Sequence, residues 1–301
     1  HPEVQAAYKK WLHELLVPVN PYTNLALRED PAVAILQMQN EDSLLFWTLS
    51  QVKGEPLHIL QGGFGEWAKK RYGSLASALK AWRGEEVEGD SPDMGRLGIR
   101  AIWDMTLEGF AKKAMPSQRL MDQAEFLTTL MRDFNAEIVR YIREEIGSKQ
   151  LVNAGNWKTA DPVTLGDLER YSYTTTDVMA VNRYAGCLHE GKHKGWAIVN
   201  GDRFDHVSFL KRPDELPFNL KQVKDTPFIV TESLWVPPTY YQAEGPFLVS
   251  AYSSLTGLDA FYWFSTADAQ WRPPSSANGF LPSLGKWVIA TPGIMGNFPA
   301  A

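Results

Sequence analysis

Short apolar runs alternate with longer segments of helical periodicity along this chain. Five runs rich in apolar residues predict buried strands, over residues 32–39, 150–154, 177–184, 226–232 and 260–264. Apolar residues that recur every three or four positions predict helices, over residues 2–16, 44–52, 65–83, 96–112, 117–146, 162–171 and 245–255. The run Gly62-Gly63-Phe64-Gly65 is expected to break the helical pattern, and Gly147 is expected to end the helix before it.

This alternation predicts an α/β fold with parallel strands that are covered on both faces. The repeated strand–helix order indicates a (β/α)8 barrel, but such a barrel needs about three βα units more than the pattern provides. Because the chain begins at His1 without Met, we expect these units to precede it. The helical stretch 53–149 is longer than one barrel helix, so we expect a helical insertion within a single domain over residues 1–301.

Composition and charge exclude several classes of function. The net charge of −5 gives no basic surface for nucleic acid, and no apolar run approaches the roughly 18 residues of a membrane span. Cys187 is the single cysteine, which excludes an intrachain disulfide and a Cys-rich metal site. The 11 Trp exceed the needs of a core. They suit flat ligands with polar edges, such as sugar rings, or a wet protein–protein surface.

Two glutamates, Glu41 and Glu232, stand at the ends of predicted strands. A carboxylate near a core is costly unless it is paired, and the carboxyl ends of barrel strands are where active sites form. Two carboxylates about 5–5.5 Å apart perform retaining glycoside hydrolysis. The alternative, in which each glutamate only leaves its strand into solvent, is less favoured for two such residues than for one.

Four segments resemble the strand motifs of clan A glycoside hydrolases, in the order that these enzymes have them. AILQMQNED (34–42) is similar to the fourth-strand motif, in which Asn-Glu supplies the acid/base. PFIVTESLW (227–235) is similar to the seventh-strand motif, in which Glu is the nucleophile. VNRYAG (181–186) resembles the sixth-strand segment and AFYWF (260–264) the eighth strand. The resemblance therefore covers the chain from about the third helix to the eighth strand, and makes residues 1–301 a catalytic barrel.

The resemblance implies a retaining hydrolase that cleaves β-glycosidic bonds of a poly- or oligosaccharide by double displacement, without a cofactor. It implies Glu41 as general acid/base and Glu232 as nucleophile. Tyr184 would donate a hydrogen bond to the nucleophile, and Asn40 would contact the sugar 2-hydroxyl. Trp263 would form the floor of a sugar subsite.

Four further residues are candidates for substrate binding. Asn182 stands where many members of the clan have His. Asn156 and Trp157 follow the predicted strand at 150–154 and would line the pocket, although Trp157 could equally pack in the core. Trp235 follows the nucleophile motif and would either border a subsite or pack. The Arg and His that the first three strands of clan members usually provide have no counterpart in this chain.

Two other functions remain open. A barrel without catalysis would be a carbohydrate-binding protein, or pseudoenzyme, that uses the same Trp-lined pocket. A metal-dependent barrel hydrolase is less favoured, because none of the six His ends a predicted strand. His189 and His193 lie in a Gly- and Lys-rich segment that is interpreted as a solvated loop, so no metal is expected. A polymeric substrate favours export, to the periplasm or outside the cell.

Overall fold

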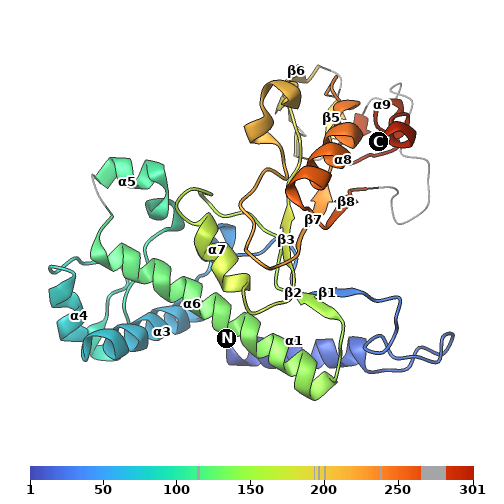
Figure 1. Ribbon diagram of the computed structural model, residues 1–301. Helices are drawn as coiled ribbons and strands as arrows, with labels where there is room; N and C mark the ends of the chain where they lie inside the picture. Colours follow the sequence, from blue (N-terminus) through green and yellow to red (C-terminus); the bar gives the residue numbers. More distant parts are fainter. Residues whose placement is uncertain (114–115, 193, 196, 200, 238, 266–282) are drawn as a thin grey trace. The chain divides into compact units, whose positions relative to one another are not determined.

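The computed structural model describes residues 1–113, 116–192, 194–195, 197–199, 201–237, 239–265 and 283–301. The chain divides into two compact units, unit 1 (His1–Asp177) and unit 2 (Val178–Ala301). Unit 1 carries most of the helices and one pair of strands, whereas unit 2 carries the larger parallel sheet (Figure 1). Each unit is described by itself below.

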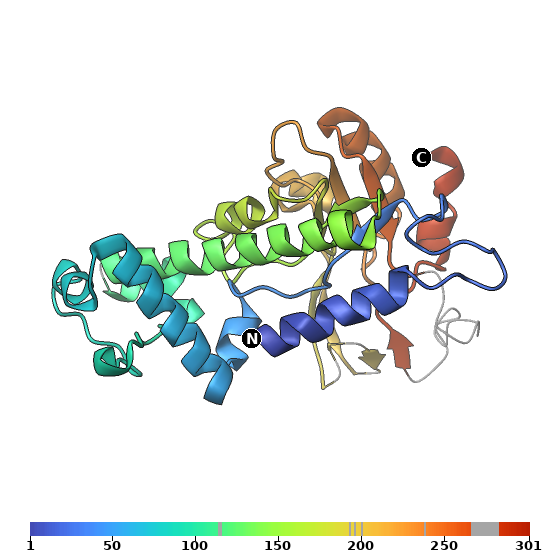
Figure 2. The same cartoon turned by 90° about the horizontal axis from the view of Figure 1, so that it is seen from below.

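Unit 1 is mainly helical within the described residues. Its helices are α1 (Pro2–Leu16), α2 (Trp47–Gln51), α3 (Gly54–Tyr72), α4 (Leu75–Ala81), α5 (Leu107–Lys113), α6 (Gln118–Arg140) and α7 (Gly166–Tyr173). Ser117 caps α6 by accepting a hydrogen bond from the N–H of Leu120, and a π-helical turn over Tyr141–Ile146 continues it to Gly147. Figures 1 and 2 both show α6 as one long rod. The helices predicted over 2–16 and 117–146 are therefore confirmed.

The predicted helix break at Gly62-Gly63-Phe64-Gly65 is wrong, because α3 runs through all four residues. A Cβ on Gly65 would lie 2.0 Å from the carbonyl oxygen of Gly95. Glycine at this position therefore allows another chain segment to pack directly against the helix backbone, and it does not end the helix. Phe64 is completely buried and stacks on Trp82, with ring centroids 5.5 Å apart, in the core of this helical part.

Two other predicted helices are shorter than expected. The helix predicted over 65–83 is divided at Gly73, whose left-handed φ of +83° ends α3. The helix predicted over 96–112 is only α5 and a 3₁₀ turn over Ile102–Met105. Before that turn, the N–H groups of Gly98 and Arg100 donate to the side chains of Asp90 and Gln123, at 2.7 and 2.8 Å, so the backbone there has no helical hydrogen bonds.

All five predicted strands are present, and they pair in parallel. In unit 1, β1 (Ile35–Gln37) pairs with β2 (Leu151–Asn153), with Ile35 opposite Leu151. In unit 2, β3 (Met179–Asn182), β7 (Phe228–Ser233) and β8 (Ala260–Trp263) form one sheet in the order β3-β7-β8. The α/β class and the parallel sheets are thus confirmed. The described strands form open sheets of two or three strands, with no closed barrel among them.

Unit 2 also contains elements that the pattern did not predict. The segment after β3, expected to be a polar loop, forms β4 (Leu188–Glu190) and β6 (Arg203–Asp205), which pair antiparallel. A second antiparallel pair joins β5 (Ala197–Val199) to β9 (Ser283–Gly285). The helices are α8 (Glu244–Thr256), close to its predicted bounds, and the short α9 (Pro292–Met295). Unit 2 has further 3₁₀ turns at Phe209–Lys211, Pro213–Glu215 and Phe298–Ala300, and unit 1 has another at Pro92–Met94.

The predicted insertion over residues 53–149 holds α3 to α6 and no strand among its described residues. The boundary between the two units lies after Asp177, outside this segment. That residues 53–149 interrupt one catalytic domain of 1–301 therefore stays a prediction.

Candidate functional site

A buried asparagine fixes the turn that carries Glu41 in unit 1. Asn156 accepts a hydrogen bond from the N–H of Glu41 through Oδ1, at 2.9 Å. Its Nδ2 donates to Asn40 Oδ1 at 2.9 Å and to Gln37 Oε1 at 3.1 Å. Because Asn156 follows β2 and the turn follows β1, these bonds extend the pairing of the two strands into the loop. Asn156 thus positions both residues of the Asn-Glu pair.

Glu41 has a left-handed backbone, with a φ of +46°. This conformation costs an ordinary L-residue roughly 1–2 kcal/mol, and it is concentrated at functional sites. The next residues are also anchored. Ser43 Oγ donates to the buried carboxylate of Glu169 at 2.6 Å and accepts from the N–H of Leu45 at 2.9 Å. The turn is therefore rigidly supported on both sides of a half-buried carboxylate.

Exposed aromatic side chains surround the same segment of unit 1. We refer to Trp47, Trp103 and Trp157 as the Trp platform. Trp47 is 52% exposed and Trp103 44%, and their rings meet edge to face at 5.5 Å. The buried ring of Phe46 contacts all three, with centroids at 5.0, 6.1 and 5.7 Å. Trp157, predicted either to line a pocket or to pack, is half-buried in this cluster.

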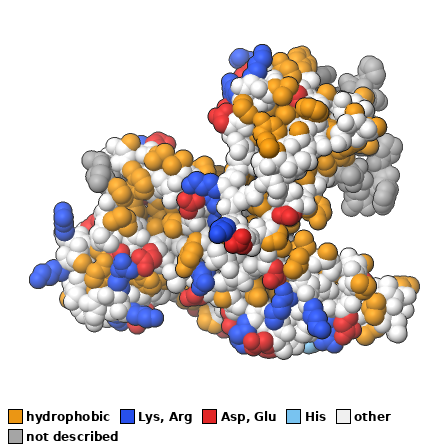
Figure 3. All heavy atoms as spheres, viewed as in Figure 1, with side chains coloured by type: hydrophobic (Ala, Val, Ile, Leu, Met, Phe, Trp, Pro, Cys, Tyr) orange, Lys and Arg blue, Asp and Glu red, His pale blue; other side chains and the backbone are white. Residues whose placement is uncertain are grey.

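Sequence reasoning missed two members of the Trp platform. Trp47 was expected only as part of a helix, and Trp103 lay inside a helix prediction that is largely wrong. Large exposed aromatic side chains that gather in one place mark a binding surface. On the face seen in Figure 3, hydrophobic side chains likewise gather in patches between charged groups of both signs.

In unit 2, Glu232 lies near the carboxyl end of β7 and is contacted by Tyr184. The Tyr184 hydroxyl donates to Glu232 Oε2 at 2.6 Å. Across the sheet, Glu232 is in register with Asn182, and the N–H of Arg183 donates to the Glu232 carbonyl at 3.0 Å. Asn182 is buried and accepts a 2.7 Å hydrogen bond from Thr231 Oγ1. The structure thus brings Tyr184 and Glu232 together, and their role in catalysis stays a prediction.

The two tryptophans predicted near Glu232 differ in exposure. Trp235 is completely buried, and a Cβ on Gly245 would lie 2.9 Å from its indole ring. It exposes no surface for a ligand, so the packing alternative describes its place in this structure. Trp263 is half-buried and lies edge to face with Phe261 at 5.0 Å and Phe298 at 5.3 Å. Part of its surface is therefore available.

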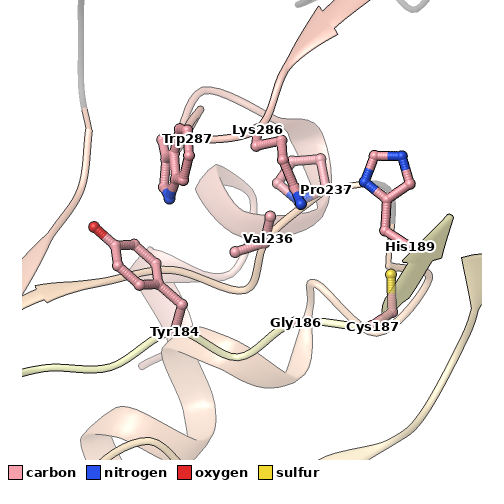
Figure 4. A pocket seen from close by; sticks show the side chains of 8 residues that line it. All are labelled: Tyr184, Gly186, Cys187, His189, Val236, Pro237, Lys286 and Trp287. Carbon is pink, nitrogen blue, oxygen red and sulfur yellow. The ribbon is translucent and has the colours of Figure 1, made fainter. Parts of the chain in front are cut away.

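A small pocket of about 200 Å³ lies beside Tyr184, within unit 2. Its lining residues are Tyr184, Gly186, Cys187, His189, Val236, Pro237, Lys286 and Trp287. Figure 4 shows Tyr184 and Trp287 on one side, Cys187 and His189 on the other, and the Lys286 side chain between them. Trp287 meets Tyr184 edge to face at 6.2 Å. Trp287 was not a candidate, because it lies beyond the last predicted strand and outside every motif.

Glu41 and its neighbours belong to unit 1, and Glu232 and its neighbours belong to unit 2. No group of three His, Cys, Asp or Glu residues in the described parts of the chain could hold a metal ion. His193, one of the pair interpreted as a loop, lies outside the described residues. None of the described helices is both long and apolar enough to cross a bilayer.

Comparison with known proteins gives one distant likeness. No family model matches the sequence, and no curated protein does. A solved structure titled "Structure of PfGH50B", a family 50 glycoside hydrolase, aligns with a TM-score of 0.39 and 14% identity. The alignment covers 77% of this chain and 28% of that one, so the chain spans little more than a quarter of that protein. At this distance the likeness assigns neither an activity nor a residue.

Proposed function

We propose that the chain carries the catalytic part of a retaining β-glycoside hydrolase, with Glu41 as general acid/base and Glu232 as nucleophile. The observation that carries the proposal is the 2.6 Å hydrogen bond from Tyr184 to Glu232, near the carboxyl end of a strand in a parallel sheet. A tyrosine hydroxyl that donates to a carboxylate stabilises its charge and fixes the oxygen that it contacts. The second oxygen then has a defined direction for attack.

The reaction proceeds in two displacements. Glu232 attacks the anomeric carbon while Glu41 donates its proton to the departing glycosidic oxygen, which leaves a covalent glycosyl-enzyme. In the second step, Glu41 takes a proton from water, and the resulting oxygen nucleophile releases the sugar and frees Glu232. This mechanism requires the two carboxyl groups to face each other at about 5–5.5 Å.

Asn156 is proposed to prepare Glu41 and Asn40 for this chemistry. It holds the N–H of Glu41 and the amide oxygen of Asn40. With its oxygen engaged, Asn40 presents its NH₂ group as a donor for the sugar 2-hydroxyl, a contact that strengthens in the transition state. A positioned donor and a fixed acid/base reduce the loss of orientational freedom during the reaction.

The Trp platform supports a saccharide chain as substrate. Indole faces are large and apolar, and they match the C–H faces of sugar rings. Trp47 and Trp103 expose about half of their surface beside the turn of Glu41. A non-catalytic carbohydrate-binding protein would use the same platform, so a measurement of hydrolysis is needed to distinguish the two functions.

The test is hydrolysis of aryl β-glycosides of several sugars by the protein and its Glu232→Ala variant, with Glu190→Ala, an exposed glutamate of the same unit, as control. We expect Glu232→Ala to lose turnover and azide to restore it, with a glycosyl azide of inverted anomeric configuration as product. Glu190→Ala should keep full activity. Binding of sugars without turnover of any glycoside by the unmodified protein would instead establish the carbohydrate-binding function.

A further inference from the structure

The pocket beside Tyr184 contains polar groups that the proposed reaction does not use. His189 Nε2 lies 2.7 Å from Asp202 Oδ2, and the two side chains are only 3% and 9% exposed. The same Asp202 oxygen accepts the N–H of Val199 at 3.0 Å. The His189–Asp202 pair is therefore fixed in the wall of the pocket and well shielded from water.

The second ring nitrogen of His189 is unsatisfied. Nδ1 is buried and has no hydrogen-bond partner among the described residues. Figure 4 shows this edge of the ring directed toward the side of the pocket where the Lys286 side chain lies. A buried polar atom without a partner is costly, so a ligand atom that pairs with Nδ1 would recover that cost.

Lys286 brings a positive charge to the same pocket. Its Nζ donates to the carbonyl oxygen of Lys194 at 2.5 Å, and it forms no ion pair with a carboxylate in the described part of the chain. Burial lowers the pKa of this ammonium group, because a charge loses hydration there. Burial also raises the pKa of the Cys187 thiol, which keeps that group neutral. The carboxylate of Asp202 acts against the lowering of the Lys286 pKa, and Lys286 is the positive group that an anionic ligand would meet in the pocket.

We propose that this pocket binds one sugar residue through an anionic substituent, a carboxylate or a sulfate, held between Lys286 Nζ and His189 Nδ1, with the sugar ring against Trp287. With the anion bound, both ring nitrogens of His189 would donate, Nε2–H to Asp202 and Nδ1–H to the anion. Tyr184 and Trp287 supply flat walls. A cavity of about 200 Å³ suits a single ring.

This inference rests on the proposed function and narrows its substrate class. The ring of Tyr184 lines the pocket, and its hydroxyl contacts the proposed nucleophile Glu232. A sugar bound in the pocket would therefore lie next to the reacting residue of the chain. The substrate would then be an acidic polysaccharide, built with uronic acids or with sulfated sugars.

The experiment is calorimetric titration of the protein with methyl β-glucuronide, methyl β-galactoside 6-sulfate and the neutral methyl β-glucoside and β-galactoside. We expect an acidic glycoside to bind at least roughly tenfold more tightly than its neutral counterpart, as charge-assisted hydrogen bonds require. The tighter of the two acidic ligands identifies the carboxylate or the sulfate. Equal binding of acidic and neutral glycosides, or binding of neither acidic one, overturns the proposal.

Variants of Lys286 test whether this pocket causes the preference for acidic glycosides. Lys286→Met should remove the preference for the acidic glycoside, Lys286→Arg should keep most of it, and Lys192→Met, at an exposed lysine, should change nothing. Circular dichroism checks that each variant folds, and Lys286→Gln serves if the Met variant does not. A preference that survives in folded Lys286→Met or Lys286→Gln protein contradicts the assignment.

The two proposals fail separately. Selective binding of acidic glycosides without any hydrolysis would keep the pocket and reject the hydrolase. Hydrolysis of acidic and neutral glycosides at equal rates, by the unmodified protein and by Lys286→Met alike, would keep the hydrolase and reject the acidic pocket.

Discussion

The surroundings of Glu41 in unit 1 and of Glu232 in unit 2 differ in the kind of surface that a ligand could contact. Beside Glu41, Trp47 and Trp103 are about half exposed and form an open surface. Beside Glu232, Tyr184 leads into a small pocket with a buried histidine. An open aromatic surface provides area for a chain of sugars, whereas an enclosed pocket with few polar groups provides selectivity for one ring.

The two glutamates are also held in different ways. The backbone of Glu41 is fixed by the side chain of Asn156, in a conformation that an L-residue rarely adopts. The backbone of Glu232 lies in a parallel strand, and its side chain is fixed by Tyr184. We therefore expect Glu41 to be sensitive to changes in its loop, and Glu232 to changes in one side-chain partner.

The largest effect is expected from Asp90→Asn, which should destabilise unit 1 and leave the stability of unit 2 unchanged. The completely buried Arg119 donates to both carboxylate oxygens of the half-buried Asp90, and a buried charge that loses its counter-charge costs up to about 3–5 kcal/mol. Hydrogen exchange should show the loss of protection in unit 1 alone. Equal loss in unit 2 would mean that the units do not unfold separately.

Low pH should cause part of the same loss of stability. Burial raises the pKa of Asp90, but hydrogen bonds from Arg119, Gly98 and Val87 more than offset it, so the pKa lies below 3.8. A carboxyl group whose pKa is lowered on folding stabilises the protein above its unfolded value. This contribution should be lost as the pH falls below about 3.8, and Asp90→Asn should remove that part of the pH dependence.

Asn156→Ala should have the next largest effect, on activity. Without the acceptor for its N–H, the Glu41 turn would relax, and a small misplacement of a catalytic group costs roughly 100-fold in rate. The measurement is kcat/KM on the best aryl glycoside. Asn135→Ala, which removes a buried asparagine bonded to the Ser172 carbonyl, is the matched control. An equal loss of activity in the control would attribute the effect to stability.

Tyr184→Phe should reduce kcat by roughly 10- to 100-fold, as expected for one hydrogen bond to a charged group. The ring remains, so the wall of the pocket is kept. Steady-state kinetics at saturating substrate measure the effect. An unchanged kcat would remove Tyr184 from the reaction, whatever its distance from Glu232.

The smallest effect is expected from Trp47→Ala combined with Trp103→Ala. Loss of stacking area should raise KM for a polymeric substrate by roughly tenfold and leave kcat on a short aryl glycoside unchanged. Trp11→Ala is the control, because Trp11 is 53% exposed in the same unit but contacts only Tyr8 among the aromatic pairs described. A change in kcat on the short substrate would place the platform in the chemistry.

Local pattern was sufficient for elements that depend on their own residues. The runs that became β1, β7 and β8 are apolar and short, and the long amphipathic α6 has a Ser cap and a terminal Gly. Elements set by distant partners were missed. Gly65 lies inside a helix and leaves room for the carbonyl group of Gly95, and that contact is invisible in the local sequence.

The residues of the candidate site also divide into those that the local sequence predicted and those that depend on distant partners. Glu41 and Glu232 were selected because they end recognisable strands, and Tyr184 was selected because its segment resembles a strand motif of clan A. The Trp platform depends on rings from three separate segments, and the partners of Asn156 lie more than a hundred residues away in the chain. Trp287 and the His189–Asp202 pair depend on short antiparallel strands that have no periodic signal. Such residues become candidates only after the chain is folded.

The most direct test of the central claim is covalent trapping of the nucleophile. A 2-deoxy-2-fluoro β-glycoside with a good leaving group slows the second displacement, so the glycosyl-enzyme accumulates and can be digested and read by mass spectrometry. If Glu232 is the nucleophile, a single label is expected on the peptide that contains it. A label on another residue, or turnover with no covalent intermediate and inverted product, would contradict this assignment.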